Sequence, residues 1–275
     1  MRKRCIELMT LLVLLSAFTG CRKHEAQMFG VVATNEVVND YGTIVEVSYS
    51  DNTKMYYRLL SETTAEVVNC YHFCLGQENV SPWVYRGDII VPERFVHNGI
   101  TYIVTSVGTD AFSRAGGWSL YYETISLISS VSIPHTVDTI RERAFKQCQN
   151  MTSINLPNSV AYIGDEAFWG TGLTSIDMSS SLTYIGRSAF SFSKLASMEI
   201  PGSVAEIAPL AFYSCKKLKT LICRPLVPPV LNSDVIGFLS DCDSLEVIYV
   251  PMESVERYKK APEWRQYNEF IEGME

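Results

Sequence analysis

The sequence has few of the features that carry chemistry. It contains only 4 histidines among 275 residues, and none of them lies in an H-E-x-x-H arrangement. A G-x-S-x-G turn for a nucleophilic serine and a glycine-rich phosphate loop are both missing. The carboxylates are scattered along the chain, which is typical of a solvated surface. We therefore expect no enzyme activity, no catalytic residue and no cofactor.

The chain also lacks an excess of positive charge and a long apolar run. Its net charge of −7 disfavours nucleic acid as a partner, because binding to phosphates needs clustered Lys and Arg. No stretch of about 18 apolar residues, the length of a membrane-spanning helix, is present. With 47% hydrophobic and 11% aromatic residues, the sequence is nevertheless too apolar for a disordered chain.

The N-terminus resembles a secretion signal. A basic start at Met1–Arg4 precedes a mostly apolar stretch from Leu8 to Phe18, which is too short to cross a bilayer. It leads into Thr19-Gly20-Cys21, and small residues before a cysteine resemble the lipobox of bacterial lipoproteins. That resemblance implies a diacylglycerol on the Cys21 thiol, although Phe18 stands where the lipobox usually has Leu. An ordinary secretory signal with an incidental cysteine is the alternative.

One apolar pattern recurs through most of the remaining sequence. Each copy has an Ala-Phe pair with Val or Ile four residues before the Ala, and the pairs are Ala111-Phe112, Ala144-Phe145, Ala167-Phe168, Ala189-Phe190 and Ala211-Phe212. A second pattern of the form L-x-x-I-x-[IL] begins at Ile128, Met151, Leu173, Leu195, Leu218 and Leu245. The last three Phe spacings are 23, 22 and 22 residues, so the pattern predicts coils of near-constant length.

Stacking explains why such a pattern is kept. Stretches such as Ile154-x-Leu156 alternate with period two, which predicts a short strand in each unit. One unit of this size cannot bury its own apolar face, whereas units stacked in register form a continuous core. We expect the small Ala where the coil packs tightly and the Phe in an aromatic ladder along the axis. The sequence therefore predicts a solenoid.

The repeat resembles the BspA-type leucine-rich repeat of bacterial surface proteins. The consensus [VL]-x-x-I-(x)3-A-F-(x)4–5-L-x-x-I-x-[IL]-P-x-S-[VL] fits residues 140–160 and 185–204 closely, and the resemblance extends over roughly residues 54–260. It implies a predominantly β, right-handed solenoid of parallel short strands joined by turns or short helical turns. It also implies a secreted or surface location and a role in adhesion or binding, while leaving the ligand open.

The ends of the chain depart from the repeat. Alternation on both sides of residues 50–53 predicts a hairpin within a β-rich N-terminal cap. Pro262 followed by Trp264, Tyr267, Phe270 and Ile271 at helical spacing predicts a helical C-terminal cap. The expected segments are a signal peptide (1–20), a tether (21–28), the N-terminal cap with a degenerate first coil (29–100), the repeats (101–251) and the C-terminal cap (252–275).

Most cysteines follow the repeat. Cys148, Cys215 and Cys242 each precede the Leu or Met of the second pattern by three residues, which predicts one column of small buried side chains. Cys215 and Cys242 lie in neighbouring coils, so a disulfide between them stays open. On a strand, Cys70 and Cys74 would lie about 13 Å apart, too far to share an ion, so we expect no metal site.

Two surfaces are candidates for binding. The first surface is a row of outward-facing residues, each lying between the two apolar residues of the second strand of its coil. The candidates in this row are Asn155, Asp177, Glu199 and Tyr249, and Ser132 and Ile222 belong to the same row. Asp177 and Glu199 are expected to be stacked directly, which places like charges about 4.8 Å apart. A second outward pair, Tyr162 over Tyr184, is expected beside the Ala-Phe corner. Ordinary stabilisation of a long sheet is the alternative for both features.

An insertion between Phe112 and Ile128 forms the second surface. It adds about ten residues while the columns on both sides keep their register, and it gathers Trp118, Tyr121 and Tyr122. These residue types dominate binding hot spots. Packing of the same aromatics against the neighbouring coil is the alternative.

The prediction for function is a cell-envelope lipoprotein that acts as a binding or adhesion scaffold for protein or glycan partners. A structural part of an envelope assembly without a small ligand is the alternative. Residues 22–25 lack the Asp that often retains lipoproteins at the inner membrane, so we expect the bacterial outer membrane and the cell surface, with a periplasmic orientation still open.

Overall fold

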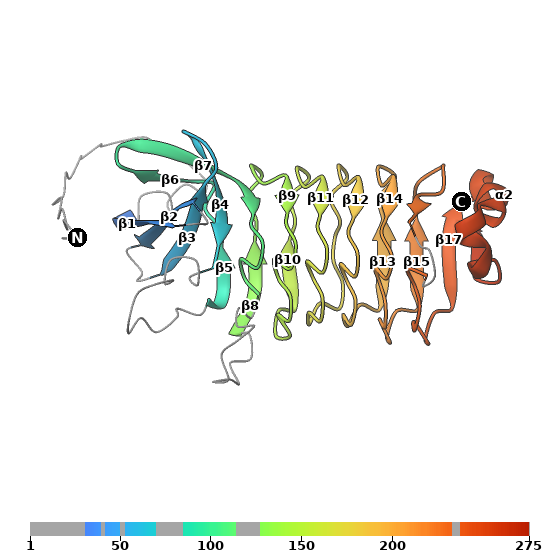
Figure 1. Cartoon of the computed structure of the whole chain (residues 1–275). Helices are drawn as coiled ribbons and strands as arrows, with labels where there is room; N and C mark the ends of the chain where they lie inside the picture. Colours follow the sequence, from blue (N-terminus) through green and yellow to red (C-terminus); the bar gives the residue numbers. More distant parts are fainter. Residues whose placement is uncertain are drawn as a thin grey trace, which may run out of the picture.

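The protein is described by a computed structural model that covers residues 31–39, 42–49, 53–69, 85–113, 127–232 and 237–274. Figure 1 shows a twisted group of strands at the N-terminal end, a row of thin coils, and helices at the C-terminal end. The fold is mostly β with few helices, and parallel strands run through the row of coils.

Antiparallel strands begin the fold. They are β1 (Val31–Asn39), β2 (Gly42–Tyr49), β3 (Lys54–Leu59) and β4 (Thr64–Val68), each paired with the next. The hairpin expected around residues 50–53 is confirmed, because β2 and β3 pair antiparallel from Ile44↔Arg58 to Ser48↔Lys54. Consecutive residues of β2, β3 and β4 are buried, so both faces of the sheet are covered. One face joins the main apolar cluster, and the other holds a small cluster of Ile44, Tyr56 and Val68.

The change from antiparallel to parallel pairing marks the first coil. Strand β4 pairs in parallel with β7 (Ile100–Val107), and β5 (Arg86–Ile90) pairs in parallel with β8 (Leu127–Ser132). Strand β6 (Arg94–His97) forms an antiparallel hairpin with β7. Residues 64–68 and 86–90 therefore occupy the positions that the two strands of each later coil occupy.

Each coil contributes one very short strand to a long parallel ladder. These strands are β9 (Thr139–Ile140), β11 (Tyr162–Ile163), β12 (Tyr184–Ile185), β14 (Glu206–Ile207) and β16 (Val230–Leu231), and they extend the sheet that begins with β1. The register is uniform, since Ile140, Ile163, Ile185, Ile207 and Leu231 are aligned from coil to coil. Identical residue types at a constant spacing thus become direct neighbours.

The second strands of the coils form two separate sheets. One has the order β10 (Ser153–Asn155), β8, β5, and the other has the order β13 (Ser197–Ile200), β15 (Thr220–Cys223), β17 (Val247–Pro251), β18 (Ile271–Met274). Residues 173–178 lie between these sheets and form no strand, although Ile176-x-Met178 predicts one. Asp and Ser are poor strand formers that compete for backbone hydrogen bonds, and the Ser181 amide donates to Ser179 Oγ at 3.1 Å.

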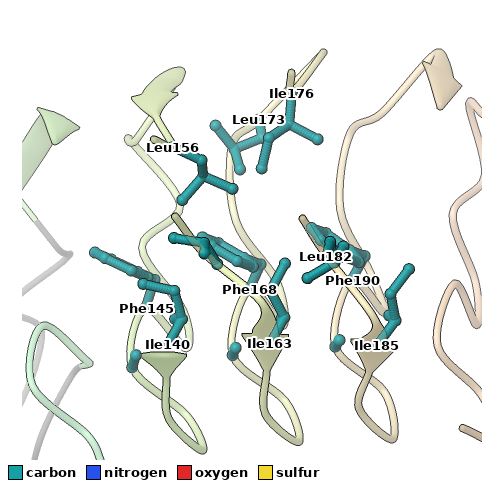
Figure 2. Close-up of a cluster of buried hydrophobic side chains, with 14 of the residues drawn as sticks. Ile140, Phe145, Leu156, Ile163, Phe168, Leu173, Ile176, Leu182, Ile185 and Phe190 are labelled. Atoms are coloured by element: carbon teal, nitrogen blue, oxygen red, sulfur yellow. The ribbon is translucent and has the colours of Figure 1, made fainter. Parts of the chain in front are cut away.

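The interior of the row of coils is one continuous apolar cluster with a phenylalanine ladder. Figure 2 shows Phe145, Phe168 and Phe190 at equivalent places in successive coils, beside Ile140, Ile163 and Ile185. The rings of Phe145 and Phe168 lie 5.2 Å apart at 7°, and neighbouring pairs repeat this geometry. The prediction that the Ala-Phe column is buried is confirmed, because the five Ala and five Phe are at most 3% exposed.

The C-terminal end is shorter in helix than the sequence predicts. It contains η2 (Met252–Ser254), α2 (Val255–Lys260) and η3 (Pro262–Tyr267) before β18. The helix starts at Pro262 as expected but is a 3-10 helix that ends at Tyr267, and Ile271 instead lies in β18 beside Ile248. Pairing with the exposed edge of β17 satisfies backbone groups that a longer helix would leave unpaired. Trp264 is fully buried and its ring contacts Phe238 at 5.2 Å.

Candidate functional site

The outer strand face carries the polar candidates in two groups. Asn155 lies exposed in β10 and aligns with Ser132 of β8. Glu199, Ile222 and Tyr249 align across β13, β15 and β17. The structure thus brings Glu199 and Tyr249 into one row and places Asn155 in a different sheet.

Asp177 is exposed but belongs to neither row. It lies in the segment 173–178 that forms no strand, so in the described part of the chain no strand ladder pairs Asp177 with Glu199. The expected alignment of Asp177 with Glu199 in one strand row is therefore wrong, because the strand face is interrupted at Asp177.

Glu199 has an opposite charge as its partner. Arg224, one coil further on, donates from Nε to Glu199 Oε1 at 3.0 Å and from a terminal nitrogen to Oε2 at 3.4 Å. This hydrogen bond raises the pKa of Arg224 above its ordinary value. Both side chains are about half exposed, and such pairs contribute only about 0–1 kcal/mol. The ion pair therefore fixes the orientation of the Glu199 side chain but contributes little to the stability of the fold.

Beyond Arg224 a proline-rich loop borders an open depression of about 550 Å³, lined in part by Val204, Leu226 and Val230. The loop is held from the C-terminal side. Tyr258 donates its hydroxyl to the Pro225 carbonyl at 2.8 Å, and Trp264 donates its indole N–H to the Pro229 carbonyl at 3.0 Å. Burial raises the pKa of Tyr258. The loop is therefore a fixed part of the surface.

The predicted tyrosine pair is confirmed. The Tyr162 and Tyr184 rings are stacked with centroids 4.8 Å apart at 7°, and the two residues are aligned partners in β11 and β12. Partial burial, followed by the nearby Asp165 charge, raises the pKa of both hydroxyls. Parallel stacking covers most of the facing ring surfaces.

The buried cysteine column is also confirmed. Cys148, Cys215 and Cys242 are at most 9% exposed and are free thiols. Each donates to the carbonyl of a Phe in the preceding coil, at 3.1–3.3 Å. The same column holds Thr171 and Ser193, so these positions favour small buried side chains.

Sequence reasoning missed a second set of surface aromatics. Trp169, Phe192 and Tyr213 follow the Ala-Phe pair by one or two residues and come from three successive coils. Phe192 is 46% exposed and contacts both of the others. The available signal was a run of aromatic residues at positions where the repeat has no consensus.

Other candidates fall outside the described residues, namely Cys21 and the insertion residues Trp118, Tyr121 and Tyr122. Within the described ranges, no three His, Cys, Asp or Glu side chains lie close enough to hold a metal ion. The described helices include none with the length and apolar character to span a membrane.

Comparisons with known proteins agree with this architecture. Residues 117–228 match the family described as BspA type leucine rich repeat region, in 6 copies. A leucine-rich repeat protein from Bacteroides ovatus is similar in structure, with 26% identity and a TM-score of 0.56 over 72% of this chain and 46% of that chain. A leucine rich repeat protein from T. pallidum is similar in fold, with 24% identity and a TM-score of 0.53 over 70% and 77% of the two chains. The search of curated proteins gave no match.

Proposed function

Residues 117–228 are a BspA-type leucine-rich repeat region, and on that premise we propose that the chain is a non-enzymatic binding scaffold of a bacterial cell envelope. Its partners are extracellular or envelope proteins or glycans. Leucine-rich repeats in general present a binding surface on a rigid stack, and the ligand is set by the residues outside the consensus. Because this chain spans 46% of the similar Bacteroides ovatus protein, partners and location are part of the proposal.

The division between inner and outer residues supports this function best. The inner columns repeat the same residue types and are nearly solvent-free, as Phe145, Phe168 and Phe190 at 0% exposure illustrate. The outward positions differ from coil to coil, for example Asn155, Glu199 and Tyr249. Outer side chains can therefore vary without disturbing the core, which is what a recognition surface requires.

The proposal includes the architecture and anchoring that go with this role. The coil is right-handed, the strands β1–β3 close its N-terminal end, and α2 and η3 with Trp264 close its C-terminal end. Exposed ends of a stack of strands would otherwise promote association with other chains. Cys21 carries the lipid that holds the chain at the outer membrane.

Two measurements test this function. Protease treatment of whole cells should remove the protein if it faces outward, and an array of matrix proteins and glycans should give specific binding by the purified chain. Protection from protease together with an empty array would support the structural envelope role instead.

Lipidation has its own test. Cys21→Ser should release the protein from the membrane fraction and abolish labelling by a fatty-acid probe, with Cys5→Ser as a matched control that keeps both. A Cys21→Ser protein that stays with the membrane, beside a wild type that takes no label, would contradict the anchor.

A further inference from the structure

Three aromatic side chains form a row along the turn edge of the coils, with Phe192 exposed and the other two partly exposed. We call Trp169, Phe192 and Tyr213 the turn-edge row. The Trp169 and Phe192 rings lie 5.1 Å apart at 57°, and the Phe192 and Tyr213 rings lie 5.4 Å apart at 78°. The Phe192 amide also donates to the Tyr213 carbonyl at 2.9 Å, which ties the row to the backbone ladder.

Tilting makes this row different from the parallel ring stacks of the array. The inner phenylalanines and the Tyr162–Tyr184 pair are parallel to within 7°, so their faces cover one another. Tilted rings leave part of each face open, and Phe192 remains 46% exposed. The row therefore offers apolar ring faces to a ligand outside the protein.

The backbone conformation of Phe192 is unfavourable for a bulky side chain. Its φ is +59°, in the left-handed region that is costly for bulky side chains. The equivalent positions of neighbouring coils hold Gln147, Gly170 and Ser214, also at positive φ. Small or polar residues suit this conformation better, so folding alone does not account for an exposed Phe here, and strain of this kind is typical of functional positions.

The two lysines next to the row are paired with carboxylates, and a further carboxylate, Asp241, accepts from a neutral hydroxyl. Lys146 lies 5.2 Å from the Trp169 ring centroid and forms an ion pair with Glu166. At the other end, the Tyr213 hydroxyl is hydrogen-bonded to Asp241, which raises its pKa, and Lys216 pairs with Asp243 at 2.7 Å. Among these groups the carboxylates outnumber the lysines by one, so they give the row no preference for a polyanion.

These features select one class of ligand. Nucleic acids also stack on aromatic rings but need an unpaired basic groove. A stable protein partner needs about 800 Å² and about 20–30 residues on each side, far more than three rings provide. Pyranose rings have apolar C–H faces that stack on aromatic faces and hydroxyl edges that bond to side chains such as Lys146 and Asp241.

We propose that the turn-edge row binds a neutral polysaccharide chain, laid along the stack across the three coils of Trp169, Phe192 and Tyr213. The inference rests on the proposed binding function and names the ligand class for one surface of it.

Native affinity electrophoresis of the full chain tests this assignment. The gels contain soluble xyloglucan, galactomannan, arabinoxylan or pullulan, with polygalacturonate as an acidic comparison. The wild type should be retarded in at least one neutral gel, and Phe192→Ser and Trp169→Ala should each weaken that binding at least tenfold. Tyr162→Ala, which opens the other exposed stack, should leave binding unchanged.

A melting curve separates recognition from packing. Phe192→Ser places the residue of the next coil at this position, so the melting temperature should stay within about 2 °C of the wild type or rise. Failure of retardation in all four neutral gels, retardation by polygalacturonate alone, or a Phe192→Ser protein that binds normally or melts several degrees lower would overturn the assignment. Binding to matrix proteins by the same sample would still leave the proposed scaffold function standing.

Discussion

The repeat array and the N-terminal sheet build their interiors in different ways. In the array, five phenylalanines from Phe112 to Phe212 stack with ring centroids 5.1–5.4 Å apart. The N-terminal sheet also buries apolar side chains such as Val45 and Tyr57, but it buries carboxylates as well, with Glu66 at 0% and Glu46 at 5% exposure. The array is stabilised by the same apolar contact repeated in every coil. The N-terminal sheet depends in addition on polar contacts that are not repeated in the array.

Glu66 illustrates this dependence. Its Oε1 accepts from Arg58 Nε at 2.6 Å, and its Oε2 accepts from Arg141 Nε at 2.7 Å and from Ser106 at 3.3 Å. Arg141 belongs to the first regular repeat, so this buried carboxylate joins the N-terminal sheet to the array. A buried charge is tolerated only with such partners. The junction therefore depends on a few particular residues, whereas the array depends on a contact that every coil repeats.

Removing one ring of the ladder should give the largest loss. Phe168→Ala leaves a cavity in the middle of the array and should lower the free energy of unfolding by about 3–5 kcal/mol. Both neighbouring interfaces are affected, because Phe168 stacks on Phe145 and on Phe190. Urea unfolding measures the effect, with the exposed Thr174→Ala as control. A loss below about 1 kcal/mol would mean that the ladder does not carry the stability of the array.

Removing the charge of Glu66 should lower the free energy of unfolding by less than removing a phenylalanine ring does. Glu66→Gln keeps the shape but removes the charge that Arg58 and Arg141 face, and should cost about 2–3 kcal/mol. Glu62→Gln, an exposed neighbour, should change the stability by less than about 0.5 kcal/mol. Equal effects of the two variants in urea unfolding would contradict the importance of this buried carboxylate.

The cysteine column should tolerate serine. Ser193 already occupies this column and contacts Cys215 at 3.2 Å, so Cys215→Ser should cost about 1 kcal/mol or less. Cys148→Ser is the matched control, because the equivalent residue of the next coil is Thr171. If Cys215→Ser alone cost about 2–5 kcal/mol, a disulfide to Cys242 would be present, contrary to the free thiols of the structure.

The surface ion pair should give the smallest effect. Arg224→Ala removes the partner of Glu199 and should change the free energy of unfolding by about 0.2–1 kcal/mol, less at high salt. Lys217→Ala removes one exposed positive charge that has no ion-pair partner among the described residues, and it controls for net charge. A larger loss that is independent of salt would show that Arg224 packs against the proline-rich loop.

Sequence periodicity predicted the array because residues at a constant spacing must meet when coils stack. The inward columns at Ala167-Phe168 and its equivalents follow directly from this. The partners of Glu66 could not be predicted, since Arg141 lies 75 residues away and neither residue belongs to a repeated column. The break at Asp177 was missed because the apolar alternation of Ile176 and Met178 outweighed the low strand propensity of the residues around them.

The candidate binding residues show the same limit. Outward positions such as Asn155 and Glu199 were identified from alternation alone, which gives the direction of a side chain but not its partner. Arg224 pairs with Glu199 from a loop whose course the repeat does not determine. Trp169, Phe192 and Tyr213 were missed because they lie at turn positions outside both apolar patterns, where the period carries no information.

We infer that inner residues of a coil determine stability and that outer residues are free for recognition. Phe190 and Phe192 test it within one coil, because they are two residues apart and are 0% and 46% exposed. The measurement is the melting temperature of Phe190→Ala and Phe192→Ala. We predict a fall on the order of 10 °C for Phe190→Ala and a change within about 2 °C for Phe192→Ala. Equal falls for the two variants would contradict the claim.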